Sequence, residues 1–157
     1  MQMTRRRLLK ISLITLITAT LLIVISVLLG NFLEQRRVRI VSESSGDFVN
    51  KWGNFKDEAS SEYLLSISKY LSEDINTEYY NSSQFIIENR GDRKPITSSF
   101  KINKEPIITK AGKNYTATIS GTRNYSDERG KYEERVYLTW EKESNKYVIT
   151  DLYGESE

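Results

Sequence analysis

Apolar residues along the chain form one long uninterrupted run and then several short periodic segments. The run, residues 11–29, contains no charge and no proline. As a helix rising about 1.5 Å per residue it covers about 28 Å, and continued to Leu33 it covers about 34 Å. That is enough to cross a hydrocarbon core of about 30 Å, so residues 11–33 are predicted to be a transmembrane anchor. The anchor depends on Ile11, Leu13, Ile14, Leu16, Leu21, Leu22, Ile23, Ile25, Leu28 and Leu29.

Two other interpretations of the apolar run are weaker. A cleaved signal peptide has an apolar run of about 7–15 residues and small residues at its cleavage site. This run is longer, and it ends in Leu-Leu-Gly-Asn-Phe-Leu without small residues at alternate positions. A buried core helix that is apolar all round needs cover on every side, and the remaining chain is too polar to supply it.

The charges that flank the anchor predict its orientation. Lys and Arg close to a membrane span favour the cytoplasmic side. Four basic residues precede the run and three follow it within residues 36–39. Residues 1–10 are therefore predicted to be a cytoplasmic stub, with the C-terminal domain outside the cytoplasmic membrane. The four basic residues are Arg5, Arg6, Arg7 and Lys10.

Helical periodicity returns after the anchor. Residues 34–45 are polar and predict either a linker or a continuation of the anchor helix. Asp47 is a candidate N-cap for a helix that carries Phe48, Trp52 and Phe55 on one face, with a break expected at Gly53.

Two further helices are predicted before the chain changes its period. One begins near Ser60 or Ser61 and places Tyr63, Leu64, Ile67, Tyr70 and Leu71 on one face. The other begins after Ser72, whose neighbours Glu73 and Asp74 suit the first turn of a helix, and is expected to run to about Tyr80.

Strand-like alternation follows. It predicts strands near residues 98–106, 115–122, 132–140 and 147–152, the first of them interrupted by Pro106. In the third strand the alternation places Trp140 on the inward face and Tyr137 on the opposite face, while Glu134 is expected at an edge where it reaches water. The fold class is therefore α+β, with short helices on one face of a bent four-stranded antiparallel sheet, formed by a domain of residues 46–157.

Composition narrows the functions that this domain can have. The chain has 23 Lys and Arg against 21 Asp and Glu. Without the four basic residues of the stub, the remainder is close to −2, which does not suit nucleic-acid binding. There is no Cys and no His, so thiolate metal sites and histidine bases are excluded. No metal site, cofactor site or catalytic motif is predicted.

The order of elements resembles the nuclear transport factor two-like cone-fold superfamily. The closing strand, Lys-Tyr-Val-Ile-Thr-Asp-Leu, is similar to the last strand of that superfamily, with Ile149 at its isoleucine. The segments Phe48–Phe55 and Lys69–Asp74 look like those of membrane-anchored members in bacterial envelopes, among them the bitopic inner-membrane scaffold of type IV secretion and conjugation systems. Asn103-Lys104-Glu105-Pro106 does not match that scaffold's Asn-Pro-x-Gly segment.

The resemblance implies a conical pocket between helices and sheet. Its expected lining is Trp52, Phe55, Tyr115, Tyr132 and Trp140. Cone-fold enzymes that resemble ketosteroid isomerases use an Asp base and Tyr donors there. The corresponding candidates are Asp74 with Tyr115, Tyr132 or Tyr137, although nothing in their spacing selects them.

Two functions remain open at this level. The favoured one is a single-pass membrane protein that presents a non-catalytic domain to other envelope proteins or to further copies of itself. The alternative is a module that binds a small apolar ligand, with or without weak catalysis. A pocket of about 300 Å³ or more, lined by convergent Tyr and Asp, favours the alternative.

Overall fold

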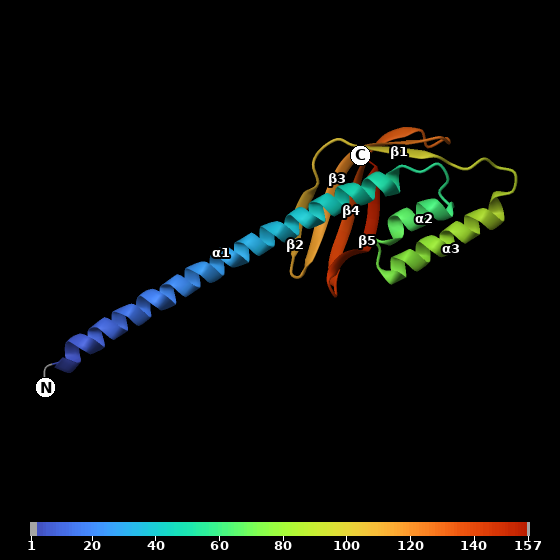
Figure 1. Ribbon diagram of the computed structural model, residues 1–157. Coiled ribbons are helices and arrows are strands. Elements are labelled where there is room, and N and C mark those ends of the chain that lie inside the picture. Colours follow the sequence, from blue (N-terminus) through green and yellow to red (C-terminus); the bar gives the residue numbers. More distant parts are fainter. Residues whose placement is uncertain (1–2, 157) are drawn as a thin grey trace. The chain divides into compact units, whose positions relative to one another are not determined.

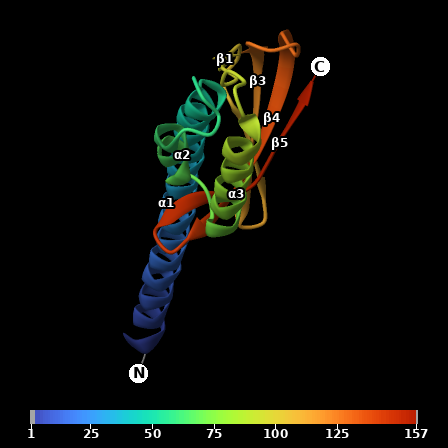
Figure 2. The same cartoon turned by 90° about the vertical axis from the view of Figure 1, so that its right-hand side faces the viewer.

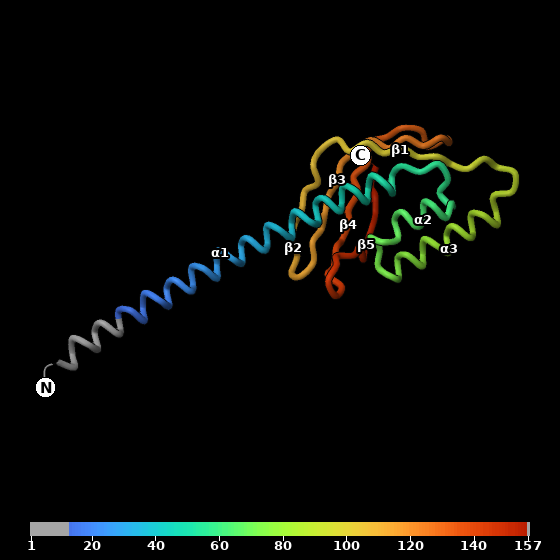
Figure 3. Tube along the Cα trace, in the orientation of Figure 1, coloured from blue at the N-terminus to red at the C-terminus, as the bar shows by residue number. Residues whose placement is uncertain are grey.

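The computed structural model describes the backbone of residues 3–156 and the side chains of residues 13–156 (Figure 3). The residues on which the predicted orientation depends, Arg5, Arg6, Arg7 and Lys10, lie outside the described side chains, as does Ile11. The chain forms two compact units, Met1–Arg37 and Val38–Glu157.

The first unit is the N-terminal part of helix α1 (Met3–Gly53). Within its described residues, the large apolar side chains are exposed, from Leu33 at 40% to Leu16 and Ile23 at 65%. The helix is long and apolar enough to cross a membrane. Hydroxyl groups in the run donate to the helix's own carbonyls, as Thr18 does to Ile14 at 2.8 Å, so these polar groups are paired within the helix.

Residues 34–45 continue α1 and do not form an irregular linker. The segment contains no proline or glycine to interrupt the helix. Val41, Ser45, Phe48 and Val49 are fully buried. They recur at helical spacing and face the core of the second unit. The prediction of a separate helix that starts at Asp47 is therefore wrong, because this segment is the last part of α1.

Helix α1 ends at Gly53, where the sequence predicts the break. The end is set by packing as well as by propensity. A Cβ atom at Gly53 would lie 2.3 Å from Cβ of Phe100, and one at Gly121 would lie 2.3 Å from Cζ of the same ring. Phe100 thus occupies a slot that exists only because both neighbours lack a side chain.

Two shorter helices follow α1. Helix α2 (Ser61–Ser68) begins where the sequence predicts, and it is capped by Ser60, whose side chain accepts from the backbone N–H of Tyr63 at 3.2 Å. Helix α3 (Glu73–Arg90) extends about three turns beyond the expected end near Tyr80. It stops at Gly91, whose φ of 56° suits glycine. The polar stretch after Tyr80 stays helical because one side of it packs on the domain: Ser83 is buried and Ile86 is partly buried.

The sheet has five antiparallel strands where four are predicted. They are β1 (Ser98–Ile102), β2 (Ile107–Ala111), β3 (Asn114–Tyr125), β4 (Lys131–Glu143) and β5 (Lys146–Ser156), in the order β1-β3-β4-β5. Pro106 divides the expected first strand in two. Both parts pair with β3, since Ile102 lies opposite Gly121 and Ile107 opposite Thr118.

The second unit is an α+β domain whose helices cover one face of the sheet (Figures 1 and 2). Trp140, 1% exposed, lies on this inward face opposite Tyr115 on β3 and Ile149 on β5. Tyr137 lies on the other face, stacked on Tyr153 with ring centroids 4.7 Å apart. The predicted assignment of the two faces is confirmed.

Candidate binding cavity

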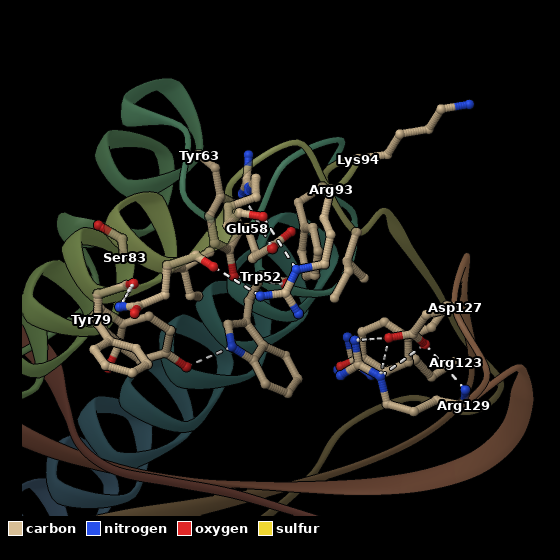
Figure 4. A pocket seen from close by; sticks show the side chains of 18 residues that line it. Trp52, Glu58, Tyr63, Tyr79, Ser83, Arg93, Lys94, Arg123, Asp127 and Arg129 are labelled. Atoms are coloured by element: carbon tan, nitrogen blue, oxygen red, sulfur yellow. Dashed lines mark hydrogen bonds and ion pairs between the residues drawn. The ribbon is translucent and has the colours of Figure 1, made fainter.

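A cavity of about 690 Å³ lies within the second unit, between the end of α1, helix α3 and the far end of β3 (Figure 4). Its inner wall is aromatic and its mouth is charged. The aromatic side chains are Trp52, Phe55, Tyr63, Tyr79 and Tyr125. The charged ones at the mouth are Glu58, Arg90, Arg93, Lys94, Asp127 and Arg129, while Arg123 lies inside.

The aromatic wall is held together by hydrogen bonds. The indole N–H of Trp52 donates to the hydroxyl of Tyr79 at 2.7 Å, and the Tyr63 hydroxyl donates to the carbonyl of Trp52 at 3.1 Å. Burial raises the pKa of Tyr79 to about 12, and burial raises the pKa of Tyr63 further. Both hydroxyls therefore keep their protons at neutral pH. Among the described residues, none accepts the proton of Tyr79.

Arg123 on β3 forms the floor of the cavity and is 1% exposed. Its Nε donates to Glu134 on β4, and its Nη1 donates to the Ser98 hydroxyl at 3.2 Å. The guanidinium lies over the Trp52 ring, 4.2 Å from the centroid. Its Nη2 is buried and has no hydrogen-bond partner in the described part of the chain. A buried unpaired donor of this kind is uncommon and calls for an explanation.

The expectation that Glu134 reaches water is wrong. Glu134 is 7% exposed, because the inward alternation of β4 includes it and Arg123 neutralises it inside the domain. The same alternation on β3 places Arg123 inward, two residues beyond Gly121. Sequence reasoning missed this residue, although continuing the inward alternation by one step would have identified the pair.

The charges at the mouth differ in how they are paired. Arg90 donates to both oxygens of Asp57, at 2.9 and 2.5 Å, and reaches Glu58 at 3.3 Å. The Arg90 guanidinium thereby lowers the pKa of Asp57. The second oxygen of Glu58, Oε2, is buried and accepts no hydrogen bond from the described residues. Arg129 pairs with Asp127 and lies 3.6 Å from the centroid of the Tyr125 ring.

Two cations at the mouth have no acidic partner among the described residues. Arg93 donates to the carbonyls of Asn89 at 2.8 Å and Arg90 at 3.2 Å, so it closes the C-terminus of α3. Lys94 is exposed and extends toward solvent in Figure 4.

The five residues predicted to line a pocket are divided by the structure. Trp52 and Phe55 line the cavity. Tyr115 and Trp140 lie in the hydrophobic core, and Tyr115 packs edge-on against Tyr147 at 5.7 Å. Tyr132 is partly buried, with its ring 6.3 Å from that of Tyr125.

The isomerase-like candidates are not brought together. Asp74 is exposed in the first turn of α3, Tyr115 is in the core, and Tyr137 lies on the opposite face of the sheet. Among the described residues, no group of three His, Cys, Asp or Glu side chains is arranged to hold a metal ion.

Several solved structures share this fold. An IcmL-like type IV secretion system protein from Legionella pneumophila matches with a TM-score of 0.58 and 13% identity, over 76% of this chain and 92% of that one. The periplasmic domain of DotI matches with a TM-score of 0.57 and 10% identity, over 74% of this chain and 94% of that one. CagV, a VirB8 homologue of a type IV secretion system from Helicobacter pylori, matches with a TM-score of 0.52 and 10% identity, over 76% of this chain and 98% of that one.

These matches establish the class of fold. The second unit has the nuclear transport factor two-like cone fold, in the form found in type IV secretion proteins. No protein-family model matches the chain, and no curated protein sequence matches it. At identities of 10–13%, the likeness concerns the fold and leaves the function to be argued from the chain itself.

Proposed function

We propose that this chain is a single-pass protein of the cytoplasmic membrane. Its N-terminus lies in the cytoplasm, and its cone-fold domain lies outside as a non-catalytic assembly module of a secretion or conjugation machine. Its partners are other envelope proteins, further copies of itself, or both. The observation that carries the proposal is the extent of the fold match: this chain covers 92–98% of three solved structures of type IV secretion proteins.

The first unit supports the membrane part of the proposal. Its described apolar side chains are exposed along the helix, an arrangement that is costly in water and favourable in lipid. The basic stub, with four Lys and Arg in the first ten residues, favours a cytoplasmic N-terminus.

The second unit supports the assembly part. Leu65 on α2 is 73% exposed, and Phe85 on α3 is 67% exposed. Large apolar side chains on a surface suit contacts with another protein. The chain has neither His nor Cys, and the isomerase-like Asp and Tyr side chains are dispersed, so the domain is better suited to contact than to chemistry.

Transfer assays test this function. Donor cells that lack the chain are expected to lose conjugation or secretion, and the full-length chain is expected to restore it. A version with the anchor replaced by a cleaved signal peptide should not. Leu65→Asp should reduce transfer while Ser61→Asp, at another exposed site on α2, should not reduce it. Unchanged transfer in the deletion strain would refute the proposal.

A topology reporter tests the orientation separately. A reporter that works only outside the cytoplasm should be active when fused after Glu157. Activity of a cytoplasm-only reporter at the same site would reverse the proposed orientation, whatever the outcome of the transfer assays.

The cavity favours a second function, the binding of a small ligand. Its volume of about 690 Å³ and its aromatic wall fall within the range of known ligand sites. The convergence of Tyr63, Tyr79, Tyr125 and Asp127 on this space is the feature expected of such a module. Phe85 belongs to both surfaces, but Leu65 lies outside the cavity lining, so assembly through Leu65 and ligand binding can be tested independently.

A further inference from the structure

Two side chains that contact Trp52 inside the cavity, Tyr79 and Arg123, each have a hydrogen-bond donor without an acceptor among the described residues. The Tyr79 hydroxyl accepts from the edge of Trp52 at 2.7 Å, which leaves its own proton without an acceptor among the described residues. The Arg123 guanidinium lies over the face of the same indole, 4.2 Å from its centroid, and its Nη2 is likewise unpaired. Tyr79 and Arg123 both line the cavity, so both donors border the space that a ligand would occupy.

Two donors call for an acceptor, and the local charge favours an anionic one. The cavity holds five cations, Arg90, Arg93, Lys94, Arg123 and Arg129. Four carboxylates lie in its wall or directly behind it: Asp57, Glu58, Asp127 and Glu134. Positive charge is thus in excess, and Arg93 and Lys94 at the mouth have no acidic partner in the described part of the chain. A hydrogen bond to a charged group is also about twice as strong as one between neutral groups.

The rest of the wall selects an apolar body for this anion. Apart from the charged rim, the lining is mainly aromatic and aliphatic and includes Phe55, Phe85, Ile86 and Ile96. Phe85 remains 67% exposed at the surface, so it can cover part of a bound chain. A strongly hydrated small anion would leave this surface without a partner.

We propose that the cavity binds an apolar monocarboxylate, an alkanoate or arylalkanoate, whose carboxylate accepts hydrogen bonds from Tyr79 and Arg123. Tyr79 donates through its phenolic O–H and Arg123 through Nη2, while the hydrocarbon chain lies along Trp52 and the aromatic wall. Glu58, whose Oε2 is unpaired, repels the carboxylate from its own side of the cavity. This site deepens the second function proposed above and does not depend on the first.

Calorimetric titration of octanoate into the full-length chain in nanodiscs tests the site, with the same titration into empty nanodiscs subtracted. Saturable binding of one octanoate per chain is expected. Octanamide has the same chain length without the charge and should bind at least about tenfold more weakly. Equal affinities, or no binding beyond that of empty nanodiscs, would overturn the proposal and mean that water satisfies the two donors.

Two pairs of variants locate the site. Tyr79→Phe removes only the hydroxyl, so the preference for octanoate over octanamide should fall about tenfold. If Tyr79 serves only to hold Trp52, both affinities would fall together and the preference would remain, which contradicts the assigned contact. Ser82→Trp, at a lining residue, should abolish binding, whereas Asn81→Trp, next to it and exposed but outside the lining, should not. The reverse pattern would place the site elsewhere.

Failure of this experiment and failure of the assembly function are distinguishable. Octanoate binding is measured on the purified chain and does not require a partner. Transfer in cells is measured without added ligand. A chain that supports transfer but binds no carboxylate overturns only the site proposed here.

Discussion

The ion pair between Arg123 and Glu134 allows a quantitative test of the domain's interior. Their side chains are 1% and 9% exposed, and Arg123 also donates to Ser98. Glu134→Gln keeps the shape of the side chain and removes its charge, so the guanidinium remains buried without a counter-ion. Breaking one partner of a buried pair costs about 3–5 kcal/mol. That is a large part of the total of about 5–15 kcal/mol expected for a domain.

A double-mutant cycle separates the pair from its surroundings. Arg123→Met alone leaves Glu134 buried without a partner, with a similar cost of about 3–5 kcal/mol. The double variant contains neither charge, so it should be more stable than the sum of the two losses implies, by about 2 kcal/mol or more. The free energy of unfolding is measured by denaturant titration of residues 34–157, which include all the buried residues of the second unit.

A more exposed ion pair at the same cavity supplies the control. Arg129 and Asp127 are 45% and 29% exposed, and Asp127→Asn should cost no more than about 1 kcal/mol. If Glu134→Gln proves as mild as Asp127→Asn, the guanidinium reaches solvent in solution. The assignment of Arg123 and Glu134 as a buried pair, and of Arg123 Nη2 as a buried unpaired donor, would then be wrong.

Three further outcomes are expected. Trp140→Ala removes a fully buried ring and should lower the free energy of unfolding by about 3–5 kcal/mol, against about 1 kcal/mol for Tyr137→Ala on the partly exposed face; the reverse order would contradict the assignment of the faces. A fragment of residues 46–157 lacks the buried Val41 and should unfold at lower denaturant than one that begins at residue 34; equal midpoints would show that the end of α1 contributes little. Arg90 holds the pKa of Asp57 in the folded domain below its usual 3.8, so the stabilisation by this ion pair is present above about pH 4 and is lost as the pH falls through the lowered pKa. The difference in stability between the wild-type chain and Asp57→Asn should therefore shrink in acid. A difference independent of pH would argue against the pairing.

Periodicity was sufficient to predict much of this domain. The alternation that ends at Trp140 identifies the inward face of β4, and Ser72 followed by two acidic residues identifies the start of α3. These signals are local: a side chain's face, or a cap, depends on residues a few positions away.

Features that depend on distant contacts could not be predicted in the same way. Pro106 indicates an interruption of the first strand. Whether the residues after it rejoin the sheet depends on whether β3 is long enough to pair with them, as residues 114–118 do. Helix α1 continues through residues 34–45 because Val41 and Ser45 are covered by other elements. The cavity itself is lined by residues from 52 to 129, and no local pattern shows that these meet.

The slot around Phe100 has a consequence for how this sequence can vary. Its side chain is enclosed by Gly53 and Gly121: an added methyl group would lie 2.3 Å from its Cβ at Gly53 and 2.3 Å from its ring at Gly121. A single substitution at either glycine must therefore displace the ring, and a residue larger than phenylalanine has no room. A smaller residue at position 100 would open space for a side chain at position 53 or 121. The three positions, far apart in the chain, are thus expected to change together or remain as they are in related sequences.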